Sequence, residues 1–157
     1  MDYRTYLMRV KTNFPDTKAI AIGNFDTVAA YEEVFKWKWA ATKLKIFSFI
    51  AFSDAMSIGQ LEPYSSACVT YARKNKKGLP VGFQNGLVCN NILVAETVDD
   101  GVIACVTSRP KKHYSILEMP IIFDLSKKQL FYYSDEIIWG KMYQSFIKEY
   151  IVKNFSI

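Results

Sequence analysis

The chain has few of the residues that build metal sites, disulfide frameworks or histidine-rich active sites. It contains three cysteines, Cys68, Cys89 and Cys105, and a single histidine, His113, in 157 residues. No two cysteines form a CxxC pair, so the usual spacing of a zinc site is missing. An odd cysteine count is also a poor basis for a disulfide framework, and it favours a reducing, cytoplasmic location. We therefore expect neither a metal nor a cofactor.

The sequence also lacks an apolar run long enough to cross a membrane. The longest run, Ile46 to Phe52, is interrupted by Ser48, whereas a spanning helix needs about 20 apolar residues. No apolar segment of the signal-peptide type follows Met1. Repeats, low-complexity tracts and Gly/Ser/Pro linkers are absent as well. We therefore expect residues 1–157 to fold as a single globular domain without membrane insertion.

What the chain does contain is a core-forming composition with a modest excess of positive charge. Half of the residues are hydrophobic and 15% are aromatic, far from the composition of disordered chains. The formal net charge is +5. Such an excess favours anionic partners, among them nucleic acid, phosphorylated ligands and acidic surfaces.

Hydrophobic periodicity predicts helices interspersed with strands. Helical spacing runs through residues 2–11, from about Val28 to Trp39, from Pro63 to Lys77, and from a cap at Ser134 or Asp135 to Ile151. Apolar or alternating runs predict strands at 18–24, 44–53, 87–95, 114–125 and 129–133. Residues 98–107 fit a hairpin or a helix, and we favour a short helix or irregular segment. The order predicts an α/β or α+β fold with a mixed sheet of about five strands and helices on both faces.

Two prolines make sharper predictions. Pro63 fits the first turn of its helix. The helix that contains it ends in a run of cations before Gly78, and cations suit a helix C-terminus. Pro120 lies inside a predicted strand, where it has no N–H to donate to a ladder. We therefore expect a sheet edge or a bulge at Pro120.

The sharpest enzymatic hypothesis is a catalytic thiol, Cys68, assisted by His113. Cys68 lies in the first turns of a predicted helix, whose dipole lowers the pKa of a thiol. A cysteine on a helix, with a histidine and a carboxylate such as Asp124 on later strands, is a plan of thiol hydrolases and transferases. Cys68 also lies on the apolar stripe of its helix, which predicts a core position. Asp124 would stand about 35 Å from His113 along one strand, too far to orient it.

A second hypothesis is anion binding by two basic segments. Residues 73–77 contribute Arg73, Lys74 and Lys77, and residues 109–114 contribute Arg109, Lys111 and Lys112. Tyr71, Phe83 and Tyr114 lie nearby in the sequence and would offer rings for stacking on bases. If the two segments converge in space, they form a phosphate-binding patch. If they do not, one neutralises a helix dipole and the other is a solvated loop.

Other nucleotide and nuclease motifs are missing. Glu118 is followed by Met119 and Pro120, so the acidic residue and lysine of a PD-(D/E)xK nuclease are not in place. The glycines at 78, 82 and 86 lack the spacing of phosphate-binding loops and are typical of turns. We therefore favour a non-enzymatic binding domain with an anionic ligand or nucleic acid as partner. The alternative is a thiol-dependent hydrolase or transferase that uses Cys68 and His113.

Overall fold

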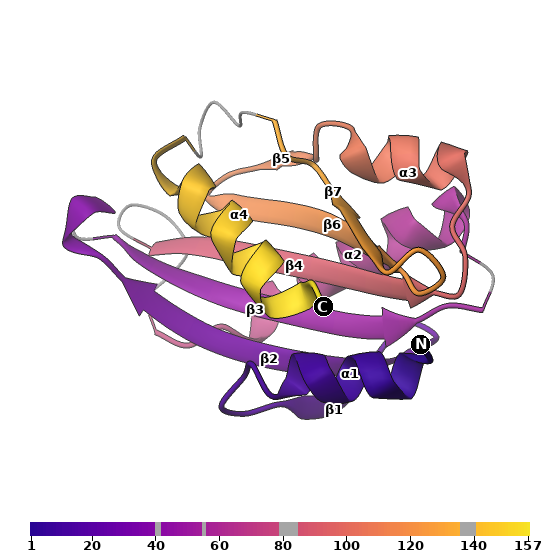
Figure 1. Ribbon diagram of the computed structural model, residues 1–157. Coiled ribbons are helices and arrows are strands. Elements are labelled where there is room, and N and C mark those ends of the chain that lie inside the picture. The colour runs from indigo at the N-terminus through magenta and orange to yellow at the C-terminus, as the bar shows by residue number, and fades with distance from the viewer. Residues whose placement is uncertain (40–41, 55, 79–84, 136–140) are drawn as a thin grey trace.

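The computed structural model describes residues 1–39, 42–54, 56–78, 85–135 and 141–157, apart from the side chain of Lys112. The helices of the described residues are α1 (Tyr3–Lys11), α2 (Ile58–Asn75), α3 (Asp100–Thr107) and α4 (Lys141–Phe155) (Figure 1). The strands are β1 (Lys18–Ile22), β2 (Phe25–Phe35), β3 (Lys43–Phe52), β4 (Asn85–Ala95), β5 (Lys112–His113), β6 (Ile116–Asp124) and β7 (Gln129–Tyr132). A short 3-10 helix, η1 (Trp37–Trp39), follows β2.

The described strands form one mixed sheet in the order β1-β2-β3-β4-β6-β5, with β7 paired to β6 on the same side as β5. β1, β2 and β3 are antiparallel neighbours, whereas β3, β4 and β6 run parallel. Parallel neighbours need a crossover connection, and α2 lies in the connection from β3 to β4. The predicted mixed α/β-type fold, with about five strands, is confirmed.

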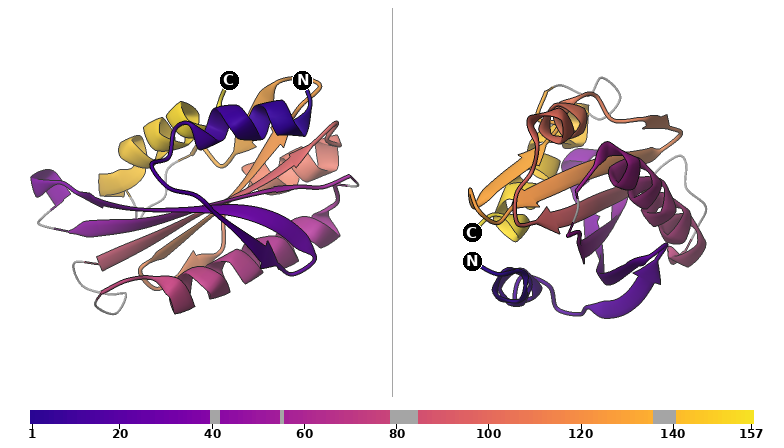
Figure 2. Two further views of the ribbon diagram at one scale, coloured as in Figure 1. Left: turned by 90° about the horizontal axis from the view of Figure 1, so that it is seen from below. Right: turned by 90° about the vertical axis from the view of Figure 1, so that its right-hand side faces the viewer.

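Helices cover both faces of the sheet. α1 and α4 lie on one face and α2 lies on the other, as the left view of Figure 2 shows. α3 packs beside β6 and β7. β3 is buried continuously from Leu44 to Ala51, because both of its faces are covered. Phe47 and Phe49 pack in the cluster beneath α2, while Ile46 and Ile50 pack toward α1 and α4. This confirms the prediction of a central strand buried on both faces.

The predicted helix from Val28 to Trp39 is wrong. These residues form most of β2, which pairs with β3 from Thr27↔Ala51 to Phe35↔Lys43, followed by η1. β2 lies near the sheet edge and is only partly buried, so its apolar residues do not alternate strictly. Tyrosine and valine suit a half-buried pleated strand, and pairing with the buried β3 outweighs a weak helical spacing.

The predictions for the two prolines have different outcomes. Pro63 lies inside α2, beyond the first turn, so that prediction is wrong. Its missing N–H leaves the carbonyl of Gly59 without a helical partner, which exposure to solvent compensates. β6 pairs with β4 along one side, and on the other with β5 at Ile116–Leu117 and β7 at Ile121–Asp124. Pro120 faces the gap between β5 and β7, so the expected edge is present locally.

The two ends of the chain meet on one face of the sheet (Figure 1). The Tyr6 hydroxyl of α1 donates to the Phe155 carbonyl at 3.0 Å, and Asn13 Nδ2 donates to the Asn154 carbonyl at 3.0 Å. The final helix is confirmed over α4, although the predicted Trp139 lies outside the described residues. Residues 98–107, for which we favour a short helix or irregular segment, contain the helix α3. No described helix combines the length and apolar character that a bilayer crossing requires.

Candidate functional site

Two hollows lie along α2, one toward each end of the helix. The first, here called the aromatic groove, has a volume of about 390 Å³; Tyr71, Asn75 and Lys77 line it at the C-terminal end of α2. The second, here called the polar pocket, has a volume of about 70 Å³, and Glu62 and Ser65 line it nearer the N-terminal end. With a rise of about 1.5 Å per residue, ten residues along a helix correspond to about 15 Å. The hollows are therefore separate sites.

The aromatic groove is built by strand register. Tyr31 of β2 and Phe47 of β3 are register partners, and their ring centroids lie 4.7 Å apart. Tyr71 of α2 meets Phe47 edge-on at 6.4 Å and Phe49 edge-on at 5.7 Å. β1 pairs with β2 only up to Ala29. The rest of β2 has no strand beyond it in the described residues, and this leaves room for the groove at the sheet edge.

Positive charge surrounds the aromatic groove. Lys18 and Lys77 line it, together with Asp16 and Asn75. The Lys77 ammonium lies 5.9 Å from the centroid of the Tyr31 ring, within the range of a cation–π contact.

Charged side chains of β2 and β3 lie next to the groove. Burial lowers the pKa of Lys45, and the positive charge of Lys76 lowers it further. Burial, together with a hydrogen bond to Glu33, raises the pKa of Tyr31 to about 12. Glu33 also pairs with Lys43 at 3.0 Å, so its charge is already compensated. The groove therefore offers rings and cations together.

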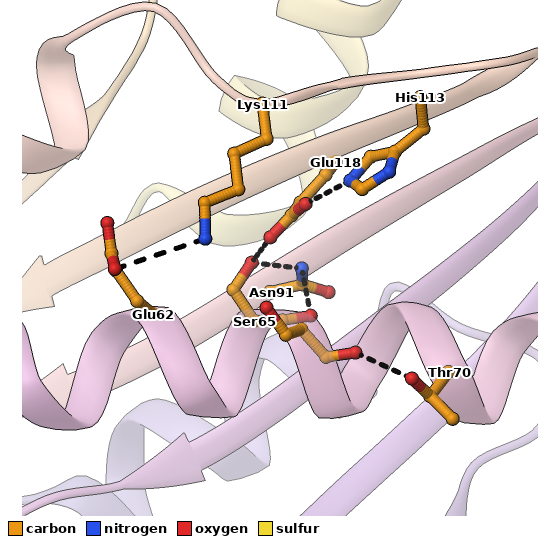
Figure 3. A network of polar contacts seen from close by, with 8 residues as sticks. Glu62, Ser65, Thr70, Asn91, Lys111, His113 and Glu118 are labelled. Atoms are coloured by element: carbon orange, nitrogen blue, oxygen red, sulfur yellow. Dashed lines mark hydrogen bonds and ion pairs between the residues drawn. The ribbon is translucent and has the colours of Figure 1, made fainter.

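The polar pocket has a chain of hydrogen bonds at its floor (Figure 3). Asn91 Nδ2 of β4 donates to Ser65 Oγ at 2.7 Å, and Ser65 Oγ donates to Glu118 Oε1 of β6 at 2.6 Å. The other carboxylate oxygen of Glu118 lies 2.5 Å from His113 Nε2. Glu118 is only 3% exposed, and a buried carboxylate needs such partners. With Nε2 directed at Glu118, the second ring nitrogen of His113 is left for other contacts.

The interrupted edge of β6 opens the polar pocket. Glu118 and Pro120 line it from β6, and Arg109, Pro110 and Lys111 line it from the segment before β5. The Lys111 ammonium lies 3.9 Å from Glu62, and both side chains are more than half exposed, at 55% and 56%. Because solvent screens such a pair, it is weak. Among the described residues, Arg109 has no recorded ion pair.

The structure places Cys68 and His113 in different surroundings. Cys68 is fully buried in the apolar cluster beneath α2, with Cys89 in the same cluster. Burial raises the pKa of the Cys68 thiol well above its usual range, which opposes thiolate formation. His113 is hydrogen-bonded to Glu118 rather than to a cysteine. Cys105, which the thiol hypothesis did not use, is half-buried and lines the polar pocket.

The two basic segments are distributed over both hollows. Arg73 and Lys74 are exposed on the last turn of α2, and Lys77 lines the aromatic groove. Arg109 and Lys111 line the polar pocket, while the side chain of Lys112 lies outside the described part of the chain. The structure thus does not bring Lys77 together with Arg109 and Lys111.

Several residues of both hollows are not among the candidate site residues predicted from the sequence. The two-residue period of β6 puts Ile116, Glu118 and Pro120 on one face of the sheet, and that parity was a usable signal for Glu118. Ser65 and Asn91 carry no motif, because their role depends on the register of α2 against β4 and β6. The sequence predicts a helix over Tyr31, and that prediction gives no sign of the pairing of Tyr31 with Phe47.

Among the described residues, no group of three or more His, Cys, Asp or Glu side chains is arranged to hold a metal ion. Lysines and tyrosines line the aromatic groove, and buried polar groups line the polar pocket. Comparison with known proteins adds no relative: no protein-family model, curated protein or solved structure matches this chain.

Proposed function

We propose that the protein is a binding domain for an anionic ligand that carries an aromatic ring, and that the aromatic groove holds this ligand. The observation that carries the proposal is the combination of Tyr31 and Tyr71 with Lys18 and Lys77 around one hollow. Tyrosine rings stack on the face of a base, and lysines contact phosphate. The net charge of +5 favours the approach of such an anion.

The size and polarity of the groove support a nucleoside phosphate as the ligand class. Its volume of about 390 Å³ falls within the range of about 300–1,000 Å³ that is usual for small-molecule sites. The Asp16 carboxylate accepts hydrogen bonds, and ribose hydroxyls or a base amino group donate them. Free nucleotides and single-stranded nucleic acid share this chemistry, so the experiment includes both.

The thiol-dependent alternative has weaker support. A nucleophilic Cys68 would need access to substrate and a base nearby, whereas this side chain is 0% exposed. The only histidine, His113, is engaged by Glu118. Both observations favour binding over thiol catalysis.

Calorimetric titration at about 50 mM salt tests the proposal, with AMP, adenosine, ribose 5-phosphate and a short single-stranded oligonucleotide as probes. We expect AMP to bind at least about tenfold more tightly than adenosine or ribose 5-phosphate, because each of those lacks one of the two recognised groups. We also expect affinity to fall as salt is raised. Much tighter binding of the oligonucleotide than of AMP would identify single-stranded nucleic acid as the ligand. Absence of binding by both AMP and the oligonucleotide would overturn the proposal.

A matched pair of variants distinguishes binding in the aromatic groove from a general effect of the protein's net charge. Lys77→Glu changes a lysine that lines the groove, and Lys74→Glu makes the same charge change on the exposed last turn of α2. We expect Lys77→Glu to weaken AMP binding about tenfold and Lys74→Glu less than about threefold, because solvent and salt screen the more distant charge. Equal effects of the two substitutions would contradict binding in the groove.

A further inference from the structure

The polar pocket has hydrogen-bond acceptors at its inner end. Glu118 lines the pocket although it is only 3% exposed. Each of its oxygens takes one hydrogen bond, from Ser65 and from His113. An ionised carboxylate has about four acceptor positions, so acceptor capacity is left over. Ser65 Oγ, in contrast, already donates to Glu118 and accepts from Asn91. A ligand group that enters this end must therefore donate hydrogen bonds.

The outer end of the pocket has the opposite character. Arg109 and Lys111 line it, and their side chains only donate. Lys111 is held by a weak, solvent-exposed pair with Glu62 at 3.9 Å, and this pair can exchange for a ligand carboxylate. The fork of the Arg109 guanidinium suits two carboxylate oxygens at once. The rim therefore selects an anionic group. The floor selects a hydrogen-bond donor, and the Glu118 carboxylate favours a cationic one.

The size of the pocket limits what joins the two groups. A volume of about 70 Å³ lies well below the range of about 300–1,000 Å³ that is usual for small-molecule sites. We therefore expect only a very small ligand to fit. Leu61, Val106 and Pro120 form apolar walls, which suit a carbon atom between the charged ends.

We propose that the polar pocket is a second binding site, for a small zwitterion of the α-amino acid class with no side chain or a very short one. Its ammonium group faces Glu118 and its carboxylate group faces Arg109 and Lys111. A simple carboxylate would lack a donor for the floor. A simple ammonium would leave the Arg109 guanidinium at the rim without a carboxylate partner. This site is separate from the aromatic groove and does not depend on the function proposed for it.

Titration of the backbone amide signals by NMR, with glycine as the probe, tests the site. We expect saturable shifts at Leu61, Val106 and Ile121, and none that saturate at Tyr31 or Asn75 in the groove. Acetate and methylammonium serve as half-ligands, and we expect each to bind at least about tenfold more weakly than glycine. Absence of saturable shifts up to about 100 mM glycine would overturn the proposal. The proposal would also be overturned if acetate or methylammonium bound as tightly as glycine.

Two variants, each with a matched control, test the orientation of the ligand. Glu118→Gln keeps the size of the side chain and removes its charge, and Glu149→Gln makes the same change on the exposed surface of α4. Arg109→Ala removes an exposed cation of the rim, and Arg9→Ala removes one from α1. We expect each pocket variant to weaken glycine binding about tenfold and each control to leave it unchanged. Because Arg109 is exposed, its variant keeps the test valid if Glu118→Gln does not fold. An unchanged affinity in Arg109→Ala would overturn the proposed orientation.

Discussion

The aromatic groove and the polar pocket lie along the same helix, yet they are stabilised by opposite means. The groove is made of rings such as Tyr31 and Phe47, which pack against each other on the sheet. The pocket depends on a hydrogen-bonded chain from Asn91 to His113, in which each group satisfies the next. Loss of one ring removes only part of the apolar contact area of the groove. Loss of one member of the hydrogen-bonded chain leaves buried polar groups unpaired. The pocket should therefore be the more fragile region.

The largest expected effect is a loss of stability from a substitution in the polar pocket. Glu118→Ala removes the acceptor of both Ser65 and His113. We expect the free energy of unfolding to fall by about 3 kcal/mol, because a buried partner is lost. Urea denaturation measures this, with the groove variant Lys77→Ala as the comparison; we expect that variant to change stability by less than about 0.5 kcal/mol. Equal losses would contradict the difference between the two regions.

A second carboxylate of β6 sharpens the comparison, because it supports the fold without lining either hollow. Burial acts to raise the pKa of Asp124, but hydrogen bonds from the Ser126 hydroxyl and the backbone N–H groups of Lys127 and Val98 lower it overall. We expect Asp124→Asn to lower stability at pH 7 by about 2 kcal/mol. Glycine binding should be unchanged in this variant.

The pH dependence of that effect has a defined sign. A folded-state pKa below the ordinary value of 3.8 stabilises the protein at pH above that value, and the gain is lost as pH falls through the folded pKa. The stability difference between the wild type and Asp124→Asn should therefore shrink below about pH 4. Unfolding curves recorded from pH 3 to pH 7 measure it. A difference that is constant over that range would refute the assigned role.

A smaller effect is expected for the groove. Tyr71→Leu keeps an apolar side chain against Phe47 and Phe49 but removes the ring. We expect AMP affinity to fall about fivefold to tenfold, since stacking on one ring contributes about 1–3 kcal/mol. Glycine binding at the polar pocket should not change. Calorimetry with both ligands gives the result, and a parallel loss of both affinities would mean that the hollows are not independent.

The smallest expected effect concerns cysteine labelling. Cys105 lines the polar pocket and is half-buried, whereas Cys68 and Cys89 are fully buried with a raised thiol pKa. An aromatic disulfide reagent should therefore modify one thiol per native chain and all three after denaturation. We expect glycine to slow the native reaction about twofold and AMP to leave it unchanged. Rapid native labelling of Cys68 would instead revive the thiol-enzyme hypothesis.

Several correctly predicted elements carry a pattern that is complete within the element itself. Examples are the doubly buried β3, the run of cations at the end of α2 and the apolar stripe of α4. Each of these patterns depends only on residues that are close together in the sequence. β2 was assigned to a helix because its residues are partly exposed and their spacing fits two periods. Only the partner strand β3 decides between those periods. The sequence predicts an edge or a bulge at Pro120, and β6 has a local edge there, because a missing N–H is a local property.

The candidate sites were predictable only in part. Lys77, Arg109, Lys111 and His113 stood out by residue type, and each lies in or beside a hollow. Their partners did not stand out, because Glu118 and Ser65 acquire a role only when α2 crosses β6. Whether the two basic segments converge was open from the sequence; Lys77 lines the aromatic groove, whereas Arg109 and Lys111 line the polar pocket.

The sequence by itself determined the class of fold, the core-forming stretches and the positive net charge, because each depends on composition and local period. Tertiary structure alone decided which polar residues meet. Asn91, Ser65, Glu118 and His113 come from four different elements, and strand register aligns them to within hydrogen-bond distance. A shift of one residue in that register would turn Glu118 to the opposite face of the sheet and abolish the pocket.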